Sequence, residues 1–250
     1  MADPIFENPK LAKLYDFFDS DEDKGDGVRE DLVHYLAMAK EFKAKRILDV
    51  GCGTGCFAHL LNEKGFKVTG LDPALASLNV AREKPNSEGI NWIHGDASSA
   101  PNGDFDIAFM TGNVAQVFIT DEEWLKNLNH IKKSLTPEGH LIFEVRDPSM
   151  KDWKNWNKAQ TFKEVLVPEI GKVTTWCEVT SEVDELVSFR WTYIFDKENE
   201  TIVSGSTLRF RSREAITKSL EDSGFSVLDV RDAPDRPGKE FVFIAIDSSK

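Results

Sequence analysis

The chain has 250 residues, 40% of them hydrophobic, which is long enough for one large domain or for one domain with an insertion. Its formal net charge of −12 argues against a nucleic-acid partner, because proteins bind phosphate backbones through clustered Lys and Arg. No apolar run approaches the roughly 20 residues that cross a bilayer, and the N-terminus shows no basic and then apolar signal segment. We therefore expect a soluble, cytoplasmic protein without membrane association.

The three cysteines are too few and too unevenly spaced for a disulfide framework, which agrees with a reducing compartment. Cys52 and Cys56 lie close together, but no other Cys or His pair has the spacing of metal ligands. We expect no bound metal.

Two helices are predicted before the first strand. The first covers residues 9–18, where apolar side chains and Tyr15 recur at helical spacing, and the second carries an apolar stripe from Val28 to Ala39. The acidic, glycine-containing stretch 19–27 between them is predicted to be a solvated loop. Taken alone, the two helices indicate a packed cover over the edge of a sheet.

The stretch 46–55 joins a short apolar strand to a turn that contains Gly51, Gly53 and Gly55. Glycines reach backbone angles that other residues avoid, and without Cβ atoms they let a ligand lie against the main chain. Residues 56–63 then read as a helix that Gly65 ends. A strand therefore leads into a helix through a ligand-binding loop.

The spacing of these glycines separates two ligand classes. A dinucleotide fingerprint, Gly-x-Gly-x-x-Gly, would place its third glycine at Cys56. The motif present is Gly-x-Gly-x-Gly preceded by Asp49, and it resembles the first motif of class I S-adenosylmethionine-dependent methyltransferases. The resemblance covers 46–145 and the C-terminal helix and hairpin. It implies that the three glycines seat the methionine part of the cofactor and that Asp49 orients their loop.

Carboxylates follow the next two predicted strands. The strand 67–71 ends at Asp72, which we interpret both as the N-cap of a helix over 73–84 and as a ligand of the two ribose hydroxyls. The strand 90–93 is followed by Asp96 and Ala97. The resemblance implies that Asp96 contacts the adenine amine, with the Ala97 backbone nearby; the alternative is an aspartate that caps its own turn.

The fourth strand, 106–110, opens into a loop that begins at Thr111, and in open α/β sheets ligands bind at such carboxyl ends. We assign Thr111 to the cofactor site and Asn113 to catalysis. The resemblance also implies an N-terminal helix that closes over the cofactor, which makes Tyr15 a lid or substrate residue, although an aromatic at helical spacing is usually core. Glu144 and Arg146, at the end of the fifth strand, are candidate substrate contacts or simple rim salt bridges.

The middle of the chain adds two further features. Thr120 and Glu123 form a capping box for a helix that precedes the fifth strand, 140–145. Within residues 147–211, the segments 173–180, 187–195 and 202–211 alternate with the period of strands, and they predict three or more antiparallel strands inserted after strand five. The insertion holds four of the six tryptophans, which line a substrate pocket, form the core of this sheet or make a dimer contact.

The chain ends with a helix over 213–222, capped by Ser212, and with strands at 225–231 and 240–246. Only eight residues separate these strands, which is too few for a parallel crossover. The two strands are therefore predicted to form an antiparallel hairpin.

The predicted fold is α/β, a doubly wound, mostly parallel seven-stranded sheet that ends in an antiparallel hairpin, with an antiparallel β-sheet inserted after strand five. We predict helices covering the cofactor site over 1–45, a methyltransferase core over 46–146 and 212–250, and an inserted subdomain over 147–211 that serves as a substrate lid or a dimer surface.

The predicted function is methyl transfer from S-adenosylmethionine to a nitrogen or oxygen atom of a small-molecule acceptor, by a monomer or a homodimer. An NAD(P)-dependent oxidoreductase is the first alternative, and the glycine spacing and the terminal hairpin oppose it. A non-catalytic S-adenosylmethionine-binding protein is the second, because an intact glycine loop does not by itself imply turnover.

Overall fold

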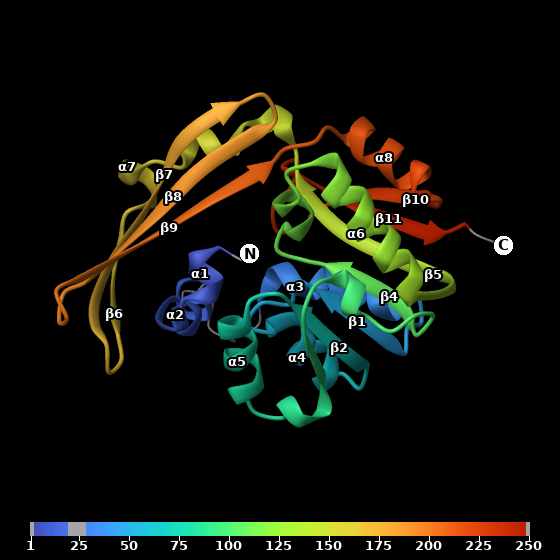
Figure 1. Ribbon diagram of the computed structural model, residues 1–250, viewed down its shortest axis with the longest axis horizontal. Helices are drawn as coiled ribbons and strands as arrows, with labels where there is room; N and C mark the ends of the chain where they lie inside the picture. The colour runs from blue at the N-terminus through green and yellow to red at the C-terminus, as the bar shows by residue number, and fades with distance from the viewer. Residues whose placement is uncertain (1–2, 20–28, 249–250) are drawn as a thin grey trace.

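The computed structural model describes residues 3–19 and 29–248, in which one seven-stranded sheet forms the core (Figure 1). Its strands are β1 (Arg46–Val50), β2 (Lys67–Asp72), β3 (Asn91–His94), β4 (Phe105–Met110), β5 (Leu135–Arg146), β10 (Phe225–Asp232) and β11 (Glu240–Asp247). They lie in the order β10-β11-β5-β4-β1-β2-β3. Strands β1 to β5 pair in parallel, whereas β11 is antiparallel to both β5 and β10. The predicted sheet and its terminal hairpin are confirmed.

Helices cover both faces of this sheet. The α-helices of the described residues are α1 (Pro4–Glu7), α2 (Pro9–Asp19), α3 (Glu30–Glu41), α4 (Cys56–Glu63), α5 (Leu75–Glu83), α6 (Asp121–Ser134), α7 (Lys158–Thr161) and α8 (Arg213–Asp222). Ile47 and Ile142 pack with α3 and α4 on one face, and Leu48 and Phe143 pack with α6 and α8 on the other. Because successive strand residues point to opposite faces, Glu144 lies on the side of Ile142, toward α3.

Helix caps follow the prediction at two positions. The Thr120 and Glu123 capping box is present at the start of α6, and the Ser212 side chain accepts a hydrogen bond from the Ala215 N–H in α8. Strand β5 begins earlier than predicted, at Leu135 instead of His140, because Leu135 pairs with Phe105 before the register shifts.

Within the described residues, four antiparallel strands form the inserted sheet between β5 and α8. They are β6 (Lys163–Val167), β7 (Gly171–Val183), β8 (Leu186–Phe195) and β9 (Glu200–Arg209). The predicted antiparallel insertion is confirmed, and β6 is a strand that the alternation did not single out. It is a short edge strand, and its Leu166 is 77% exposed.

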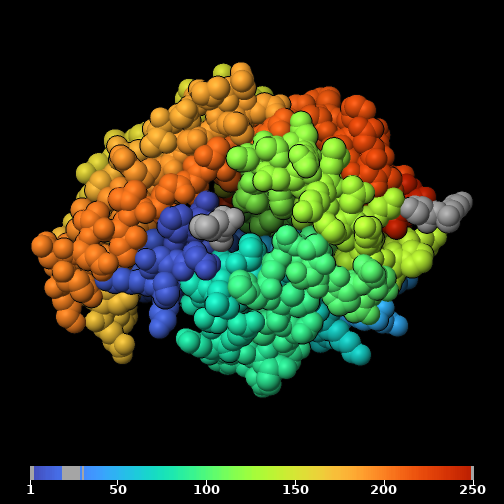
Figure 2. All heavy atoms as spheres, viewed as in Figure 1, coloured from blue at the N-terminus to red at the C-terminus, as the bar shows by residue number. Residues whose placement is uncertain are grey.

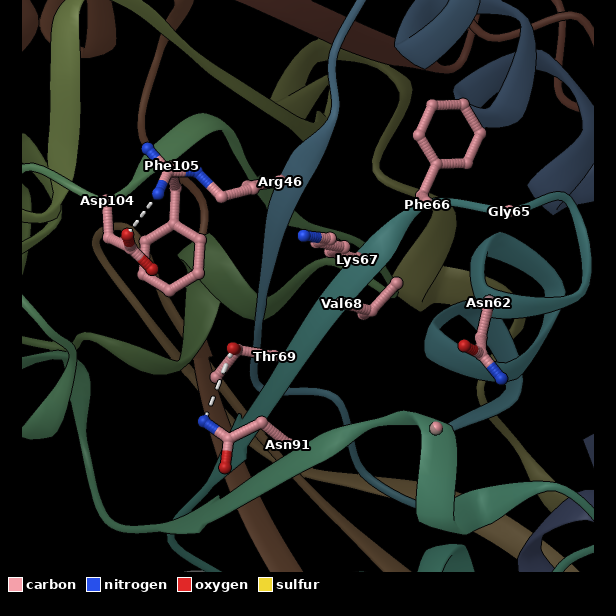
Figure 3. A pocket seen from close by; sticks show the side chains of 11 residues that line it. Arg46, Asn62, Gly65, Phe66, Lys67, Val68, Thr69, Asn91, Asp104 and Phe105 are labelled. Carbon is pink, nitrogen blue, oxygen red and sulfur yellow. Dashed lines mark hydrogen bonds and ion pairs between the residues drawn. The ribbon is translucent and has the colours of Figure 1, made fainter.

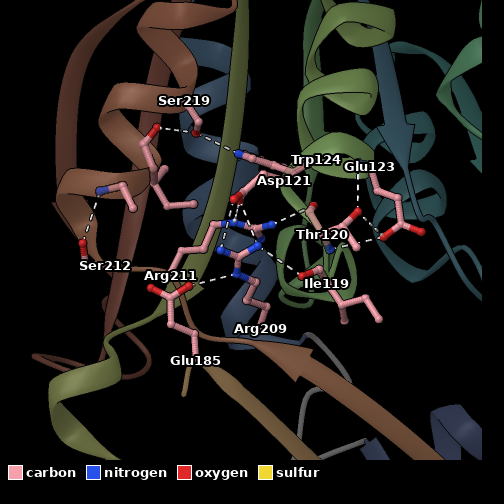
Figure 4. Close-up of polar contacts among 12 residues, drawn as sticks. Ile119, Thr120, Asp121, Glu123, Trp124, Glu185, Arg209, Arg211, Ser212 and Ser219 are labelled. Carbon is pink, nitrogen blue, oxygen red and sulfur yellow. Dashed lines mark hydrogen bonds and ion pairs between the residues drawn. The ribbon is translucent and has the colours of Figure 1, made fainter. Parts of the chain in front are cut away.

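Two arginines anchor the end of β9 to the core (Figure 4). Arg209 forms ion pairs of 2.9 Å with both Asp121 and Glu185. Arg211 is 4% exposed, and its Nη2 donates to the Thr120 carbonyl at 2.9 Å. Asp121 is the first residue of α6, where the helix dipole favours a carboxylate. The inserted sheet is thus fastened next to the helix that follows β4.

The N-terminal helices α1 and α2 lie between the inserted sheet and α5 (Figures 1 and 2). Apolar side chains of α2 share one cluster with side chains of β7 and β8. The Ile5 N–H donates to Ser204 Oγ of β9 at 2.9 Å, and Ser77 Oγ of α5 donates to the Phe6 carbonyl at 2.9 Å. These helices therefore contact the core and the insertion at the same time.

The acidic loop predicted over 19–27 lies outside the described residues, except for Asp19, which ends α2. Val28, the start of the predicted second stripe, is also outside them. None of the described helices has the length and apolar content of a membrane span.

Candidate functional site

The glycine loop between β1 and α4 has the left-handed backbone that its residues predict. Gly51, Gly53 and Gly55 have φ values of +73°, +54° and +78°. A Cβ on Gly55 would lie 2.6 Å from the Trp92 ring, so packing within the protein requires this glycine. A Cβ on Gly53 would meet nothing within 4 Å. Gly53 thus leaves an open face of main chain, which fits a ligand that lies directly against the loop.

Asp72 ties this loop to the end of β2. Its Oδ2 accepts the Gly53 N–H at 2.8 Å, and its Oδ1 accepts the Ala74 N–H at 2.7 Å. The predicted N-cap role is wrong, because α5 begins at Leu75 with Ala74 as its N-cap. Burial raises the pKa of Asp72. A carboxylate has about four acceptor positions, so two remain for ribose hydroxyls, and that contact stays a prediction.

Asp49 lies at the end of β1 and is 1% exposed. Neither of its carboxylate oxygens accepts a hydrogen bond of good geometry among residues 3–19 and 29–248, although the Ala58 backbone N–H acts to lower its pKa. Burial, reinforced by the charge of Asp72, raises the pKa of Asp49 to about 7. A buried acceptor without a donor costs free energy, and a donor or a cation brought by a ligand would recover it.

Asp96 is exposed and caps its own turn. Its Oδ1 accepts hydrogen bonds from Ser98 N at 2.9 Å and from Ser98 Oγ at 2.5 Å. Ala97 beside it is buried, and Thr111 at the end of β4 is half-buried. The turn contact does not use up the acceptor positions of the carboxylate, and the cofactor contacts of these three residues stay predictions.

A polar cluster lies at the carboxyl ends of β4 and β5. It consists of Tyr35, Asn113, Gln116, Glu144, Arg146, Arg236 and Glu240. Glu144 is 3% exposed, its Oε1 accepts the Asn113 N–H at 2.6 Å and its Oε2 accepts the Tyr35 hydroxyl at 2.5 Å. Burial raises the pKa of Glu144 to about 7, although both hydrogen bonds act in the opposite direction. Glu144 therefore lies behind Asn113, with both oxygens engaged.

Arg146 links the cluster to the inserted sheet. Its Nη1 donates to Gln116 Oε1 at 3.2 Å, and its Nε lies 3.9 Å from Glu240 Oε1. Its guanidinium stands 5.5 Å from the centre of the Trp156 ring. Burial lowers the pKa of Arg146, and the charges of Glu240 and Glu144 oppose this shift. The ring of Tyr15, on α2, lies 5.5 Å from that of Phe6.

The neighbour of Tyr15 on α2, Asp16, joins the N-terminal segment to the glycine loop. Its Oδ1 accepts from the Thr54 hydroxyl and from Cys56 Sγ, the latter at 3.3 Å, and its Oδ2 forms a 2.5 Å ion pair with Lys84. Helix α2 is therefore fastened over the loop. Cys56, considered above as a metal ligand, has instead this hydrogen bond to a carboxylate.

Several members of the site gave no signal in the sequence. Tyr35 was predicted only as part of an apolar helix, and Arg236 and Glu240 only as part of a hairpin. His34, beside Tyr35, has Nδ1 3.9 Å from Asp235 Oδ1, and neither of its ring nitrogens has a hydrogen-bond partner in the described part of the chain. The one available clue was a charged Glu240 directly before the apolar run 241–246 of β11.

Two surface hollows lie away from the glycine loop. The first, of about 520 Å³, is lined by the amino ends of β1 to β4, including Arg46 and Lys67 (Figure 3). Ligands of open α/β sheets bind at the other edge, so we do not assign this hollow to the site. The second, of about 300 Å³, is lined by Trp153 and Trp156 of the insertion. Trp156 is the ring that Arg146 faces.

Comparison with known proteins agrees with this geometry. A family model described as a methyltransferase domain matches residues 24–230. A cypemycin N-terminal methyltransferase from a Streptomyces species is 27% identical over 150 residues, which cover 60% of either chain. Among such curated relatives, the chain spans between 29% and 64% of their length.

Solved structures share the fold over nearly the whole chain. An S-adenosylmethionine-dependent methyltransferase from Clostridium acetobutylicum superposes with a TM-score of 0.74 at 19% identity, over 97% of this chain and 99% of that one. An amino pentose methyltransferase from Micromonospora echinaspora, with S-adenosylmethionine bound, superposes with a TM-score of 0.69 at 20% identity, over 90% and 93%. The chain therefore belongs to the methyltransferase domain family and has the fold of its class I, S-adenosylmethionine-dependent members.

Proposed function

We propose that this protein transfers a methyl group from S-adenosylmethionine to a nitrogen or oxygen atom of a small-molecule acceptor. The observation that carries the proposal is the open main-chain face of Gly53, held by Asp72, at the same sheet edge as the polar cluster. Ligands bind outside this edge of an open α/β sheet. A cofactor on the loop would present its reactive end toward Asn113 and the cluster.

The cofactor would be held by the residues that the family motif indicates. Gly51, Gly53 and Gly55 would seat the methionine part, and the unpaired oxygens of Asp49 suit its ammonium group. Asp72 would hold the ribose, and Asp96 with Ala97 would contact the adenine end. Thr111, in the loop that also holds Asn113, would face the reactive end of the cofactor. S-adenosylmethionine supplies a methyl group that is already activated on a sulfonium.

The protein's own task is then to place the acceptor. Orientation of two reactants can contribute roughly 7–11 kcal/mol to lowering a barrier, so few chemical groups are required. Asn113 and Tyr15 are our candidates for groups that contact the acceptor, and Arg146 would pair with an anionic part of it. We assign Glu144 to the support of Asn113 instead of to substrate contact, because both of its oxygens already accept hydrogen bonds.

The N-terminal helices and the insertion would enclose the acceptor. Residues 1–45 would cover the cofactor, 46–146 and 212–250 would form the catalytic core, and 147–211 would form a wall of the substrate site. Trp153 packs on Phe210 with a centroid distance of 4.4 Å, so this tryptophan also belongs to the core of the insertion. We propose a monomer or homodimer as the working unit.

The experiment is methyl transfer from radiolabelled S-adenosylmethionine to a panel of amines and hydroxyl compounds. Names of relatives include an amino pentose methyltransferase, an N-terminal methyltransferase and a fatty-acid O-methyltransferase, so the panel contains amino sugars, peptides with free N-termini and fatty acids. Asn113→Ala is expected to lower transfer at least tenfold while cofactor affinity stays within twofold. Asn199→Ala is the matched control, because Asn199 is also left-handed, with φ +50°, and lies in an exposed turn of the insertion.

Cofactor binding without transfer to any member of a broad panel would favour the non-catalytic binding protein. Binding of NAD(P)H in place of S-adenosylmethionine would favour the oxidoreductase. If Asn113→Ala and Asn199→Ala lower methyl transfer equally, Asn113 has no role in the mechanism.

A further inference from the structure

Asn113 is held by its surroundings at every polar atom except one. Its N–H donates to Glu144 at 2.6 Å, its carbonyl accepts the Gln116 N–H at 3.0 Å, and its Nδ2 donates to Glu240 Oε1 at 3.2 Å. Its backbone is left-handed, with φ +61°, a conformation that persists where the surroundings over-determine it and that is frequent at functional sites. The residue is only 4% exposed.

The remaining polar atom, Oδ1, is buried and has no hydrogen-bond partner among the described residues. A buried acceptor without a donor is destabilising, so the unpaired Oδ1 of a residue with a strained backbone needs an explanation. A ligand that brings a donor to this atom would supply it.

Glu240 decides which end of the amide is left free. It is 5% exposed, begins β11 and is paired in register with Arg146 of β5. Arg236 Nη1 donates to its Oε1 at 2.8 Å, and Arg146 Nε lies 3.9 Å from the same atom. An oxygen that already faces two guanidinium groups acts as an acceptor, so the Asn113 amide must turn its NH₂ toward Glu240. The flipped amide would place two oxygens against each other.

We propose that Glu240 is a positioning residue for methyl transfer: it fixes the Asn113 amide so that Oδ1 accepts a hydrogen bond from an N–H or O–H on the acceptor atom. The inference rests on the proposed function and narrows its substrate class. An uncharged primary or secondary amine, or an alcohol, can donate to Oδ1 and keep a lone pair free for the methyl group. As that lone pair bonds to the methyl carbon, the carbon–sulfur bond would break, S-adenosylhomocysteine would leave and the proton of the acceptor would pass to water. An uncharged tertiary amine has no hydrogen to donate.

The need for a hydrogen on the acceptor atom limits how many methyl groups one nitrogen can receive. A primary amine that receives one methyl group still has an N–H and can bind again, whereas the uncharged dimethylated product, the form that could accept a third methyl group, has none. Methylation of an amine is therefore expected to stop at two methyl groups.

The first test observes the amide itself, on full-length ¹⁵N-labelled protein. The Asn113 side-chain signals are assigned by their loss in Asn113→Asp. In the wild type, the NMR chemical shifts of the Asn113 side-chain NH₂ group should differ from those of a free amide. Its protons should also exchange with water at least tenfold more slowly than those of the exposed Asn199 side chain. Signals at free-amide positions would overturn the proposal without any variant that could misfold.

The second test uses Glu240→Gln, with Asp229→Asn as the matched control, because Asp229 lies on the same hairpin in an exposed pair with Arg231. Glu240→Gln should shift or double the Asn113 signals, leave S-adenosylmethionine affinity within twofold, and lower kcat at least tenfold for the best panel acceptor. Unchanged Asn113 signals, or a kcat equal to that of Asp229→Asn, would refute the role of Glu240.

The third test compares the best panel amine with its mono- and dimethylated forms on wild-type protein saturated with S-adenosylhomocysteine, at a pH above the pKa of the amines, where all three forms are uncharged. The dimethylated form is expected to bind at least tenfold more weakly than the primary amine, and equal affinity would contradict the donor requirement. Failure of the wild type to bind S-adenosylmethionine would instead remove the proposed function. Normal cofactor binding with a mobile Asn113 amide would remove only this inference.

Discussion

The Tyr35 hydroxyl donates to a carboxylate that has almost no contact with water, and its removal should therefore have a pH-dependent cost. Tyr35→Phe deletes one of the two donors to Glu144. A hydrogen bond to a charged group contributes about 1.5–3 kcal/mol, and one between neutral groups about 0.5–1.5 kcal/mol. We expect the free energy of unfolding to fall by about 2 kcal/mol at pH 8.5, where Glu144 is ionised, and by about 1 kcal/mol at pH 5.

The sign follows from the pKa of Glu144, which burial raises from 4.5 to about 7 in the folded state. Between these values the folded state binds more protons than the unfolded state, so stability falls as the pH rises through this window. Tyr35→Phe raises the folded pKa further. The difference in free energy of unfolding between wild type and variant therefore grows with pH. It reaches its full size only above the pKa that Glu144 has in the variant.

Urea unfolding of both proteins at pH 5, 7 and 8.5 measures this difference. Tyr193→Phe is the matched control: this buried tyrosine has its pKa raised by burial, and no carboxylate is among the causes, so its cost should not change with pH. If Tyr35→Phe lowers the free energy of unfolding equally at pH 5 and pH 8.5, the Tyr35 hydroxyl does not stabilise the ionised form of Glu144.

Two further predictions concern the glycine loop and its cover. Asp16→Asn removes a partly exposed ion pair with Lys84 and should weaken S-adenosylmethionine binding by up to about fivefold, or about 1 kcal/mol. It should also speed cofactor dissociation, which stopped flow measures. An unchanged dissociation rate would contradict the idea that Asp16 fastens α2 over the cofactor loop. Gly53→Ala and Gly55→Ala should separate cofactor binding from folding. Gly53→Ala adds a methyl group to the open face of the loop, and it should lower cofactor affinity at least tenfold while lowering the free energy of unfolding by about 1 kcal/mol. Gly55→Ala should lower the free energy of unfolding by about 2–4 kcal/mol, measured by thermal or urea unfolding, because its Cβ meets Trp92. Equal stability losses in the two variants would be evidence against this division of roles.

Local patterns predicted the fold well because its elements follow from short-range rules. The strand-glycine-helix unit at 46–63, the Thr120 capping box and the short connection between the last two strands each lie within about ten to twenty residues. Strand β6 is less distinct, since its five residues alternate weakly and leave Leu166 exposed.

The site was only half predictable for the same reason. Asp72 was correctly placed at a strand end, but one of its carboxylate oxygens bonds to Gly53, which is 19 residues away, and the helix cap falls at Ala74. Glu144 was identified as a polar residue at the site, yet its partner Tyr35 is 109 residues away on α3. Glu240 and Asn113 are 127 residues apart. Such pairs depend on sheet order, which no local pattern contains.

The most direct test of methyltransferase function is calorimetric binding of S-adenosylmethionine to the wild type, to Asp72→Ala and to Asp104→Ala, on protein cleared of prebound cofactor. Asp104 pairs with Arg46 at the opposite edge of the sheet and serves as the control. We predict micromolar binding that Asp72→Ala weakens at least tenfold, or about 1.4 kcal/mol, and that Asp104→Ala leaves unchanged. No heat and no thermal shift with folded wild-type protein would mean that this chain does not bind S-adenosylmethionine.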